Sequence, residues 1–339
     1  MKRIHLLAIA VLVAIPLTGM GGEAKLVRYP SYHDGRVAFT YLGDIWTADE
    51  NGQNLRRITA NKARDQYPRF SPDGKWIAFS SDRAGNLDVY VIPAQGGTAK
   101  QLTFHSSDDS VLGWTPDSKG VLFSSARGDD FMPNLYVVAI DGGMPRKAGT
   151  DMGVWGCYSP DGKKLAVNRK AQVYWRKYYR GAYQSDVTVV DLAAGKFTDL
   201  TDFNGEDSWP MWSQDEHIYF VSDREGNGLT NIWRVPEAGG KAERITSFKS
   251  GDVRWPSISS DGRIIVFEHD FEVWKLDLAS KKAAPIHLDI AAETEENMTE
   301  VETFASQADD YDLDPAGHRV VFSIHGEIFT APVAEGDIR

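Results

Sequence analysis

The most constraining feature of this chain is a short phrase that recurs along it and joins an Asp-Gly turn to an apolar run. The fullest copy, SPDGKWIAFSSDR, covers residues 71–83, and successive turn aspartates lie 39 to 54 residues apart. The turn aspartates are Asp34, Asp73, Asp117, Asp161, Asp215 and Asp261. Self-similarity at such a period is typical of architectures in which each unit buries its apolar face against the next.

Each copy carries the signals of four short strands. An aromatic-Pro or apolar pair precedes the turn, as in Tyr67-Pro68, and the apolar run follows it. A third strand begins with a polar, an aliphatic and usually an aromatic residue, and a glycine turn leads to a fourth that ends in Ile-Thr or Leu-Thr. Alternation and β-branched residues favour strands over helices. Units of this kind predict an all-β fold, a six-bladed β-propeller of four-stranded antiparallel blades around an axial hole, over residues 26–283.

The way the ring closes follows from where the first copy begins. Its innermost strand starts almost at residue 25, so the sequence offers no spare segment to complete the last blade. We therefore predict that blades one and six close by side-chain packing alone.

The recurring turn aspartates and tryptophans could be functional, but we interpret both as structural. The turn aspartates are expected to accept hydrogen bonds within their own turns, rather than to bind metal ions or act as catalytic acids. The ten tryptophans are spread over nearly all copies and are expected to pack blade against blade.

The repeat is interrupted most strongly between Asp161 and Asp215. The extra residues read AQVYWRKYYRGAYQ over 171–184, a basic aromatic segment in an acidic chain. Such a mixture suits docking against another surface, and a loop folded over its own blade is the alternative interpretation. The candidate docking residues are Tyr174, Trp175, Arg176, Lys177, Tyr179 and Arg180.

Both ends of the chain differ from the repeat. Residues 1–24 combine Lys2 and Arg3 with an apolar run and small residues, which predicts a cleaved signal peptide and a periplasmic or secreted protein; a membrane anchor is the alternative. We assign residues 25–288 to the six-bladed propeller and the acidic stretch 289–305 to a linker. Residues 306–339 repeat the blade pattern once more and are interpreted as the truncated start of a second β-propeller.

Composition and motifs exclude several kinds of chemistry. A net charge of −11 opposes binding to phosphate, so no nucleic-acid partner is expected. The single cysteine, Cys157, cannot form an intrachain disulfide and is expected to be a buried, inert thiol. The sequence contains neither a G-x-S-x-G nucleophile elbow nor a phosphate-binding P-loop, and its histidines are scattered. We therefore predict no catalytic, cofactor-binding or metal-ligating residue, and no cofactor.

Three segments carry a family resemblance beyond the repeat. They are the opening YPSYHDGRVAFTYLGDIW from Tyr29, the insertion WRKYYRGAY from Trp175, and the return of the blade pattern after an acidic linker. With these segments the sequence resembles the tricorn protease family of S41-type serine peptidases. The insertion is similar to the family's W-K-x-Y-R-G-G, with Ala182 in place of the second glycine.

The resemblance implies a function for the region as a whole. It would be the noncatalytic propeller of an exported tricorn-like serine peptidase, would gate the passage of peptides or unfolded polypeptide, and would dock to a C-terminal propeller, a PDZ-like domain and a protease domain beyond Arg339. Homo-oligomer formation and enzymatic activity of the parent protein stay open, and this chain alone is expected to have no peptidase activity. A TolB-like periplasmic protein-interaction propeller is the alternative function, and a channel that binds a small ligand is a third.

Overall fold

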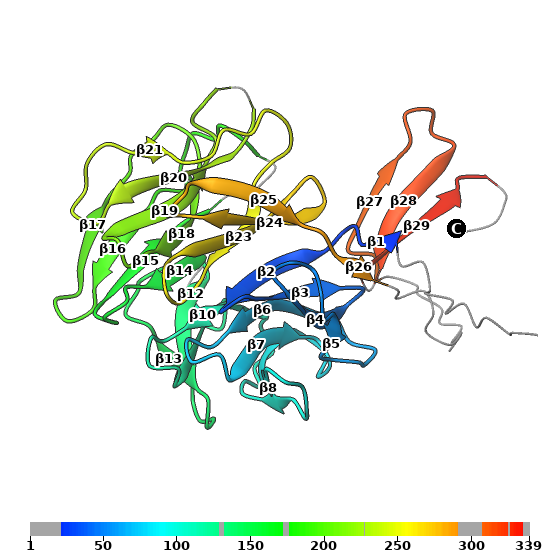
Figure 1. Cartoon of the computed structure of the whole chain (residues 1–339), viewed down its shortest axis with the longest axis horizontal. Coiled ribbons are helices and arrows are strands. Elements are labelled where there is room, and N and C mark those ends of the chain that lie inside the picture. The colour runs from blue at the N-terminus through cyan, green and yellow to red at the C-terminus, as the bar shows by residue number, and fades with distance from the viewer. Residues whose placement is uncertain are drawn as a thin grey trace, which may run out of the picture.

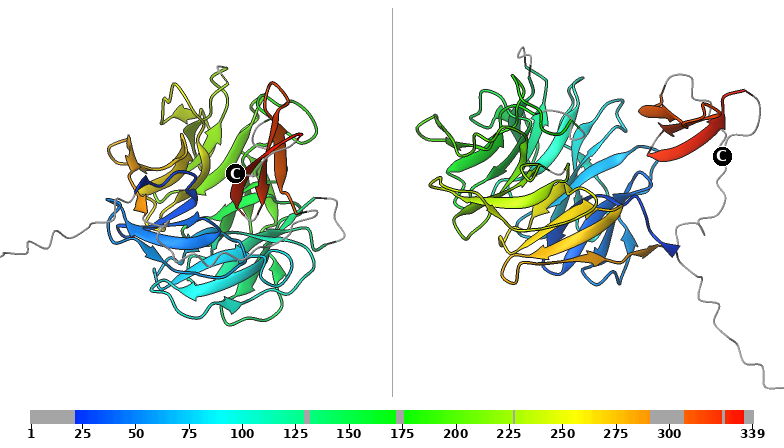
Figure 2. Two further views of the ribbon diagram at one scale, coloured as in Figure 1. Left: turned by 90° about the vertical axis from the view of Figure 1, so that its right-hand side faces the viewer. Right: turned by 90° about the horizontal axis from the view of Figure 1, so that it is seen from above.

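Six radial β-sheets form the body of the molecule. The computed structural model describes residues 22–128, 132–171, 176–226, 228–290, 307–324 and 326–334. Within these residues six four-stranded antiparallel sheets surround a common axis, and a separate three-stranded sheet stands beside the ring (Figures 1 and 2). The predicted all-β, six-bladed architecture is confirmed.

Each blade takes its four strands from one continuous segment. The first blade is β2–β5 (Arg28–His33, Arg36–Tyr41, Asp44–Asp49, Arg56–Arg57), the second β6–β9 (Asp65–Phe70, Trp76–Ser81, Asp88–Pro93, Lys100–Gln101) and the third β10–β13 (Asp109–Trp114, Gly120–Ser125, Asn134–Ala139, Arg146–Lys147). The fourth is β14–β17 (Trp155–Tyr158, Lys164–Asn168, Thr188–Asp191, Lys196–Asp199), the fifth β18–β21 (Asp207–Trp212, His217–Ser222, Asn231–Pro236, Glu243–Arg244) and the sixth β22–β25 (Arg254–Ile258, Ile264–His269, Glu272–Asp277, Lys282–Ile286).

Local hydrogen bonds explain why the turn phrase recurs. In the second blade the Ser71 hydroxyl donates to Asp73 Oδ1 at 2.6 Å, and the Lys75 amide donates to the same oxygen at 3.2 Å. Gly74 completes the turn with φ +68°, a conformation that costs glycine little. The same side-chain bond joins Thr115 to Asp117, Ser159 to Asp161 and Ser259 to Asp261. At these four turns the predicted structural role of the aspartate is confirmed.

A second repeated interaction is an Arg–Asp ion pair at the strand ends that lie away from the Asp-Gly turns. Asp65, Asp109 and Asp207 begin the innermost strands of their blades and are fully buried. Each accepts a hydrogen bond from an arginine that follows the second strand of the same blade. The pairs are Arg83–Asp65 at 2.8 Å, Arg127–Asp109 at 2.5 Å and Arg224–Asp207 at 2.5 Å.

The apolar core lies between neighbouring blades. One buried cluster joins Val89 and Val91 of the second blade to Val121 and Phe123 of the third, with Trp114 among them. Equivalent clusters occupy the other seams. Blade-to-blade packing is thus confirmed for Trp114, and the cluster between the fifth and sixth blades contains Trp209, with Trp155 and Trp255 packed against it.

The seam between the first and sixth blades differs in one respect from the prediction. Side chains such as Phe39 and Val273 do pack across it. In addition, β1 (Gly22–Glu23) pairs antiparallel with β26 (Asp289–Ile290) outside the blades, and the Ala24 amide donates to Leu288 O at 2.7 Å. Closure by side chains alone is therefore wrong: the segments that flank the first and sixth blades run side by side and satisfy each other's backbone polar groups.

A buried acid strengthens the same seam. Glu268 of the sixth blade accepts from Arg28 Nε at 3.0 Å and from the Tyr29 amide at 2.7 Å. Burial raises the pKa of the Glu268 carboxyl, and the positive charge of Arg28 opposes that shift.

The three-stranded sheet is β27–β29 (Asp310–Leu313, Arg319–Ile324, Glu327–Pro332). In Figure 1 it stands clear of the ring on the side of β1 and β26. Arg64 of the ring reaches Asp309 just before it at 2.6 Å. Tyr311, Leu313 and Ile328 of this sheet are more than half exposed.

Candidate functional site: the axial cavity

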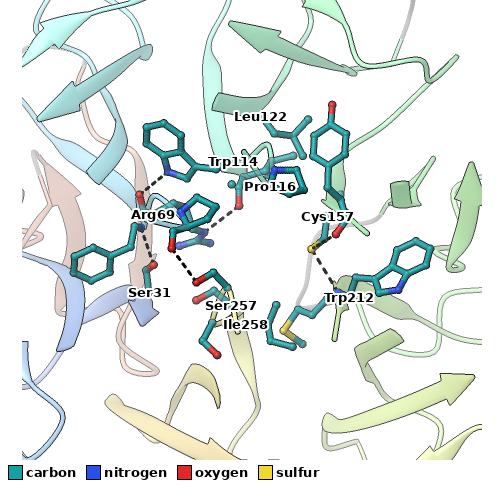
Figure 3. Close-up of a pocket in the computed structure, with 18 of the residues that line it drawn as sticks. Ser31, Arg69, Trp114, Pro116, Leu122, Cys157, Trp212, Ser257 and Ile258 are labelled. Atoms are coloured by element: carbon teal, nitrogen blue, oxygen red, sulfur yellow. Dashed lines mark hydrogen bonds between the residues drawn. The ribbon is translucent and has the colours of Figure 1, made fainter. Parts of the chain in front are cut away.

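The innermost strands of all six blades enclose an axial cavity of about 320 Å³. Its mouth lies among the Ser-Pro-Asp-Gly turns, where Pro72, Pro116 and Pro160 line it. Deeper residues from each blade include Ser31, Arg69, Leu112, Trp155, Cys157, Trp209 and Ser257. In Figure 3, Arg69 and Ser31 lie on the side of the cavity opposite Cys157 and Trp212.

Five aromatic side chains meet on the axis. They come from five different blades and are Tyr29, Tyr67, Trp155, Trp209 and Trp255. Ring centroids lie 4.3 Å apart for Tyr29–Tyr67, 5.0 Å for Tyr29–Trp255, 4.8 Å for Trp155–Trp209 and 5.5 Å for Trp209–Trp255. Tyr67 and Trp255 belong to the non-adjacent second and sixth blades, yet their rings are only 5.5 Å apart. The expected axial hole is therefore occupied at this level, and we call these five residues the axial aromatic cluster.

A backbone feature turns four of these rings inward. Tyr29, Tyr67, Trp209 and Trp255 each precede a proline and adopt φ between 46° and 56°. At each position the pairing of the first and second strands shifts register. Such bulges re-aim a side chain, here toward the axis. The sequence pattern singled out the aromatic-Pro pairs as strand starts. The predicted blade-to-blade packing is confirmed for Trp155, Trp209 and Trp255, and their rings also meet on the axis.

Arg69 is the one arginine that lines the cavity, and it follows the Tyr67-Pro68 pair. Its Nε donates to Leu112 O at 3.1 Å, and its Nη1 donates to Pro68 O at 2.9 Å and Tyr29 O at 3.4 Å. Within the described part of the chain no carboxylate lies within ion-pair distance of it. Burial lowers the pKa of Arg69 to about 10, which leaves the guanidinium protonated at neutral pH.

Cys157 also faces the cavity and is only partly buried, contrary to the expectation of a buried thiol. Its sulfur accepts a weak hydrogen bond from the Trp212 amide at 3.5 Å. Because desolvation raises the pKa of the thiol, it stays protonated and unreactive at neutral pH, as the sequence predicted.

The insertion of the fourth blade lies over its neighbours. Lys177 binds Asp252 Oδ1 at 2.7 Å and also donates to the carbonyl of Gly228, while the Tyr178 amide donates to Asp223. Residues 177 and 178 therefore bind groups of the fifth and sixth blades, whereas Gln184 at the end of the insertion donates to Asp186 of its own blade. Among the candidate docking residues Arg176 and Arg180 are exposed, and Arg176 lies over the Tyr179 ring at 4.2 Å. Tyr174 and Trp175 lie outside the described residues.

Glu206 beside this insertion makes stability depend on pH. Desolvation, reinforced by the charge of Asp223, raises the pKa of Glu206 from 4.5 to about 8, and its Oε1 has no hydrogen-bond partner among the residues described. The folded state holds a proton that the unfolded state has lost, so the free energy of unfolding falls as the pH rises between those values.

The variant Glu206→Gln, which mimics the protonated acid, is expected to lose less stability over this range. Its Tm should match that of the wild type near about pH 5 and exceed it by about 3 °C near about pH 8.5. Thermal unfolding followed by circular dichroism across this range measures the difference, and identical profiles for both proteins would contradict the assignment.

Metal-ligating side chains are not gathered anywhere in the described residues. No group of three His, Cys, Asp or Glu side chains there could hold a metal ion. No helix among those residues is both long and apolar enough to cross a membrane. His33 lines the cavity mouth and packs against Phe70 at 5.9 Å, whereas buried His269 lies between Phe248 and Trp274.

Comparison with known proteins places this architecture in a family. Residues 24–282 match the family model for the tricorn protease N-terminal beta propeller domain. The chain belongs to that family. A tricorn protease homolog 1 from Streptomyces coelicolor is 32% identical over 271 residues, which are 78% of this chain and 24% of that protein. A tricorn protease homolog from Saccharolobus solfataricus is 27% identical over 256 residues, or 74% and 23% of the two chains.

Solved structures agree with the tricorn-type fold. The crystal structure of the tricorn protease superposes with a TM-score of 0.69 at 22% identity and covers 93% of this chain and 31% of that one. A putative TolB from Agrobacterium tumefaciens reaches a TM-score of 0.57 at 22% identity, covering 70% and 87%. The chain thus spans about a quarter of the length of the tricorn homologues that it matches.

The sequence interpretation missed Arg69 and the convergence of the cluster. A signal for both was present, since an aromatic-Pro pair recurs in the innermost strand, and residues of that strand face the axis of a propeller.

Proposed function

We propose that this tricorn-type propeller is the noncatalytic gating region of an exported serine peptidase. In this role it restricts the passage of peptides along its axis and docks to the catalytic part of a longer protein. One observation carries the proposal: five aromatic side chains from five blades meet on the axis of the propeller. The propeller belongs to the family of tricorn protease N-terminal propellers. Because these rings are in contact and occupy the axis, a peptide passes only if they move apart, and this selects what passes without any bond-breaking chemistry.

Other features are compatible with this role. Export is proposed from residues 1–24. Cleavage after these residues would remove β1 and its pairing with β26. For docking, we propose the insertion of the fourth blade, where Lys177 anchors the loop to Asp252 and Gly228 while Arg176 and Arg180 are exposed. Exposed arginines beside aromatic rings are common at protein interfaces.

A TolB-like interaction propeller is the second candidate function. It is favoured by the likeness in fold to the putative TolB and by a TolB from Desulfosudis oleivorans that is 35% identical over 71 residues. In that case the exposed mouth of the ring would bind an envelope protein and no peptidase would be involved.

The gating proposal is tested in the full-length protein that contains this chain. Trp209→Ala removes one ring of the cluster, and is expected to change the turnover of a long unstructured polypeptide relative to that of a fluorogenic tetrapeptide. Phe104→Ala removes an aromatic side chain that is 78% exposed and far from the constriction, so it should leave the ratio unchanged.

An unchanged ratio in a folded Trp209→Ala protein would refute gating by the cluster. The 339-residue chain alone is expected to cleave neither substrate. Activity that survived repurification and disappeared on mutation of a residue in this chain would contradict a noncatalytic role.

A further inference from the structure

We propose that the axial cavity is a binding site for the C-terminal carboxylate of a peptide, with Arg69 as the residue that pairs with it. The assignment deepens the proposed function and rests on it in so far as the ligand is a peptide. It names the ligand chemistry of the cavity and does not require that the chain be part of a peptidase.

The charge of the cavity selects an anion. The lining contains no Asp or Glu, and its charged members are Arg69 and, when protonated, His33. A carboxylate that enters therefore meets no like charge among the lining residues. A peptide ammonium group would meet an unfavourable cation.

Arg69 retains unused donors. Its three hydrogen bonds all go to backbone carbonyls through Nε and Nη1 and hold the guanidinium in place beside the cluster. Nη2 donates to no partner within the described residues, and no acid there lies within ion-pair distance of the group, although the charge of Glu268 acts on it. A pre-positioned guanidinium with free N–H groups is suited to a carboxylate, because planar N–H donors match two carboxylate oxygens.

The shape of the cavity selects the end of a chain. The axial aromatic cluster occupies the axis beyond the cavity, so an extended peptide entering from the turn face advances end first. Prolines 72, 116, 160, 210 and 256, together with Trp155 and Met211, give the walls an apolar surface. Such walls suit an apolar last side chain, while Arg69 recognises the terminal carboxylate.

The experiment compares three short peptides of the same sequence, Ala-Ala-Phe, on the 339-residue chain. They are the N-acetylated free acid, the N-acetylated C-terminal amide and the C-terminal amide with a free N-terminus. Binding is followed by isothermal titration calorimetry and by quenching of tryptophan fluorescence, to which Trp155 and Trp209 contribute. The free acid is expected to bind at least about tenfold more tightly than either amide.

Variants assign the preference to one residue. Arg69→Met is expected to abolish the difference between acid and amide, and Arg69→Lys to retain part of it because the charge remains. Arg56→Met, which removes an exposed arginine of β5 outside the cavity, should leave the difference intact.

The outcomes are distinct from those of the gating test. Equal affinity of the wild-type chain for acid and amide, or no binding of any peptide, overturns carboxylate recognition even if no variant folds. If Arg69→Met still prefers the free acid over the amide, another residue recognises the carboxylate, and the role of Arg69 is overturned. Gating is tested separately, by the ratio of polypeptide turnover to tetrapeptide turnover in the full-length protein.

Discussion

Replacing Glu268 by alanine is expected to lower the free energy of unfolding by about 3–5 kcal/mol, the range for breaking a buried ion pair by removing one partner. Glu268 is 8% exposed and serves both Arg28 and the Tyr29 amide across the seam that closes the ring. Its loss removes the carboxylate that both of these groups bind at that seam. Urea denaturation of the two proteins measures the change.

A matched control lies in the same seam. Glu272 binds Lys25 at 2.7 Å between the first and sixth segments, but the Lys25 side chain is 50% exposed. Glu272→Ala should therefore change stability by less than about 1 kcal/mol. A similar small effect for Glu268→Ala would show that the ring closes without the buried acid.

Removal of the Trp209 ring is expected to cost about 3–5 kcal/mol as Trp209→Ala, because the deletion leaves a cavity between two other tryptophans. Trp209 contacts Trp155 and Trp255, with centroid distances of 4.8 and 5.5 Å. The near-ultraviolet circular dichroism should weaken by more than the loss of one isolated tryptophan, since close rings couple.

Phe104→Ala serves as the control for this change as well. Its side chain is 78% exposed, and the effect on the free energy of unfolding should stay within about 0.5 kcal/mol. If Trp209→Ala costs less than about 1 kcal/mol, the rings do not form a packed cluster on the axis, and the gating proposal loses its main support.

The fold could be predicted because its signals are local. The bond from Ser71 to Asp73 and the left-handed conformation of Gly74 involve residues a few positions apart, and the same interaction recurs at Asp117, Asp161 and Asp261. Such interactions specify a strand–turn–strand unit without reference to the rest of the chain. Repetition of the unit then predicts the ring.

The contacts of the fourth-blade insertion could not be predicted from local signals. Its basic aromatic composition identified an unusual segment, but not which groups it would contact. Lys177 meets Asp252 and Gly228 from two other blades, and only the folded ring brings these groups together. The exposed Arg176 and Arg180 remain candidates for docking.

By itself, the sequence determined the blades, their number, their internal turns and the kinship with tricorn propellers. Only the tertiary structure decided what occupies the axis, because Tyr67 and Trp255 lie in the second and sixth blades and meet once the ring has closed. The same holds for Arg69, which is left without a carboxylate by the arrangement of all six inner strands. Local hydrogen bonds are encoded in neighbouring residues, whereas convergence on an axis depends on the closure of the entire chain.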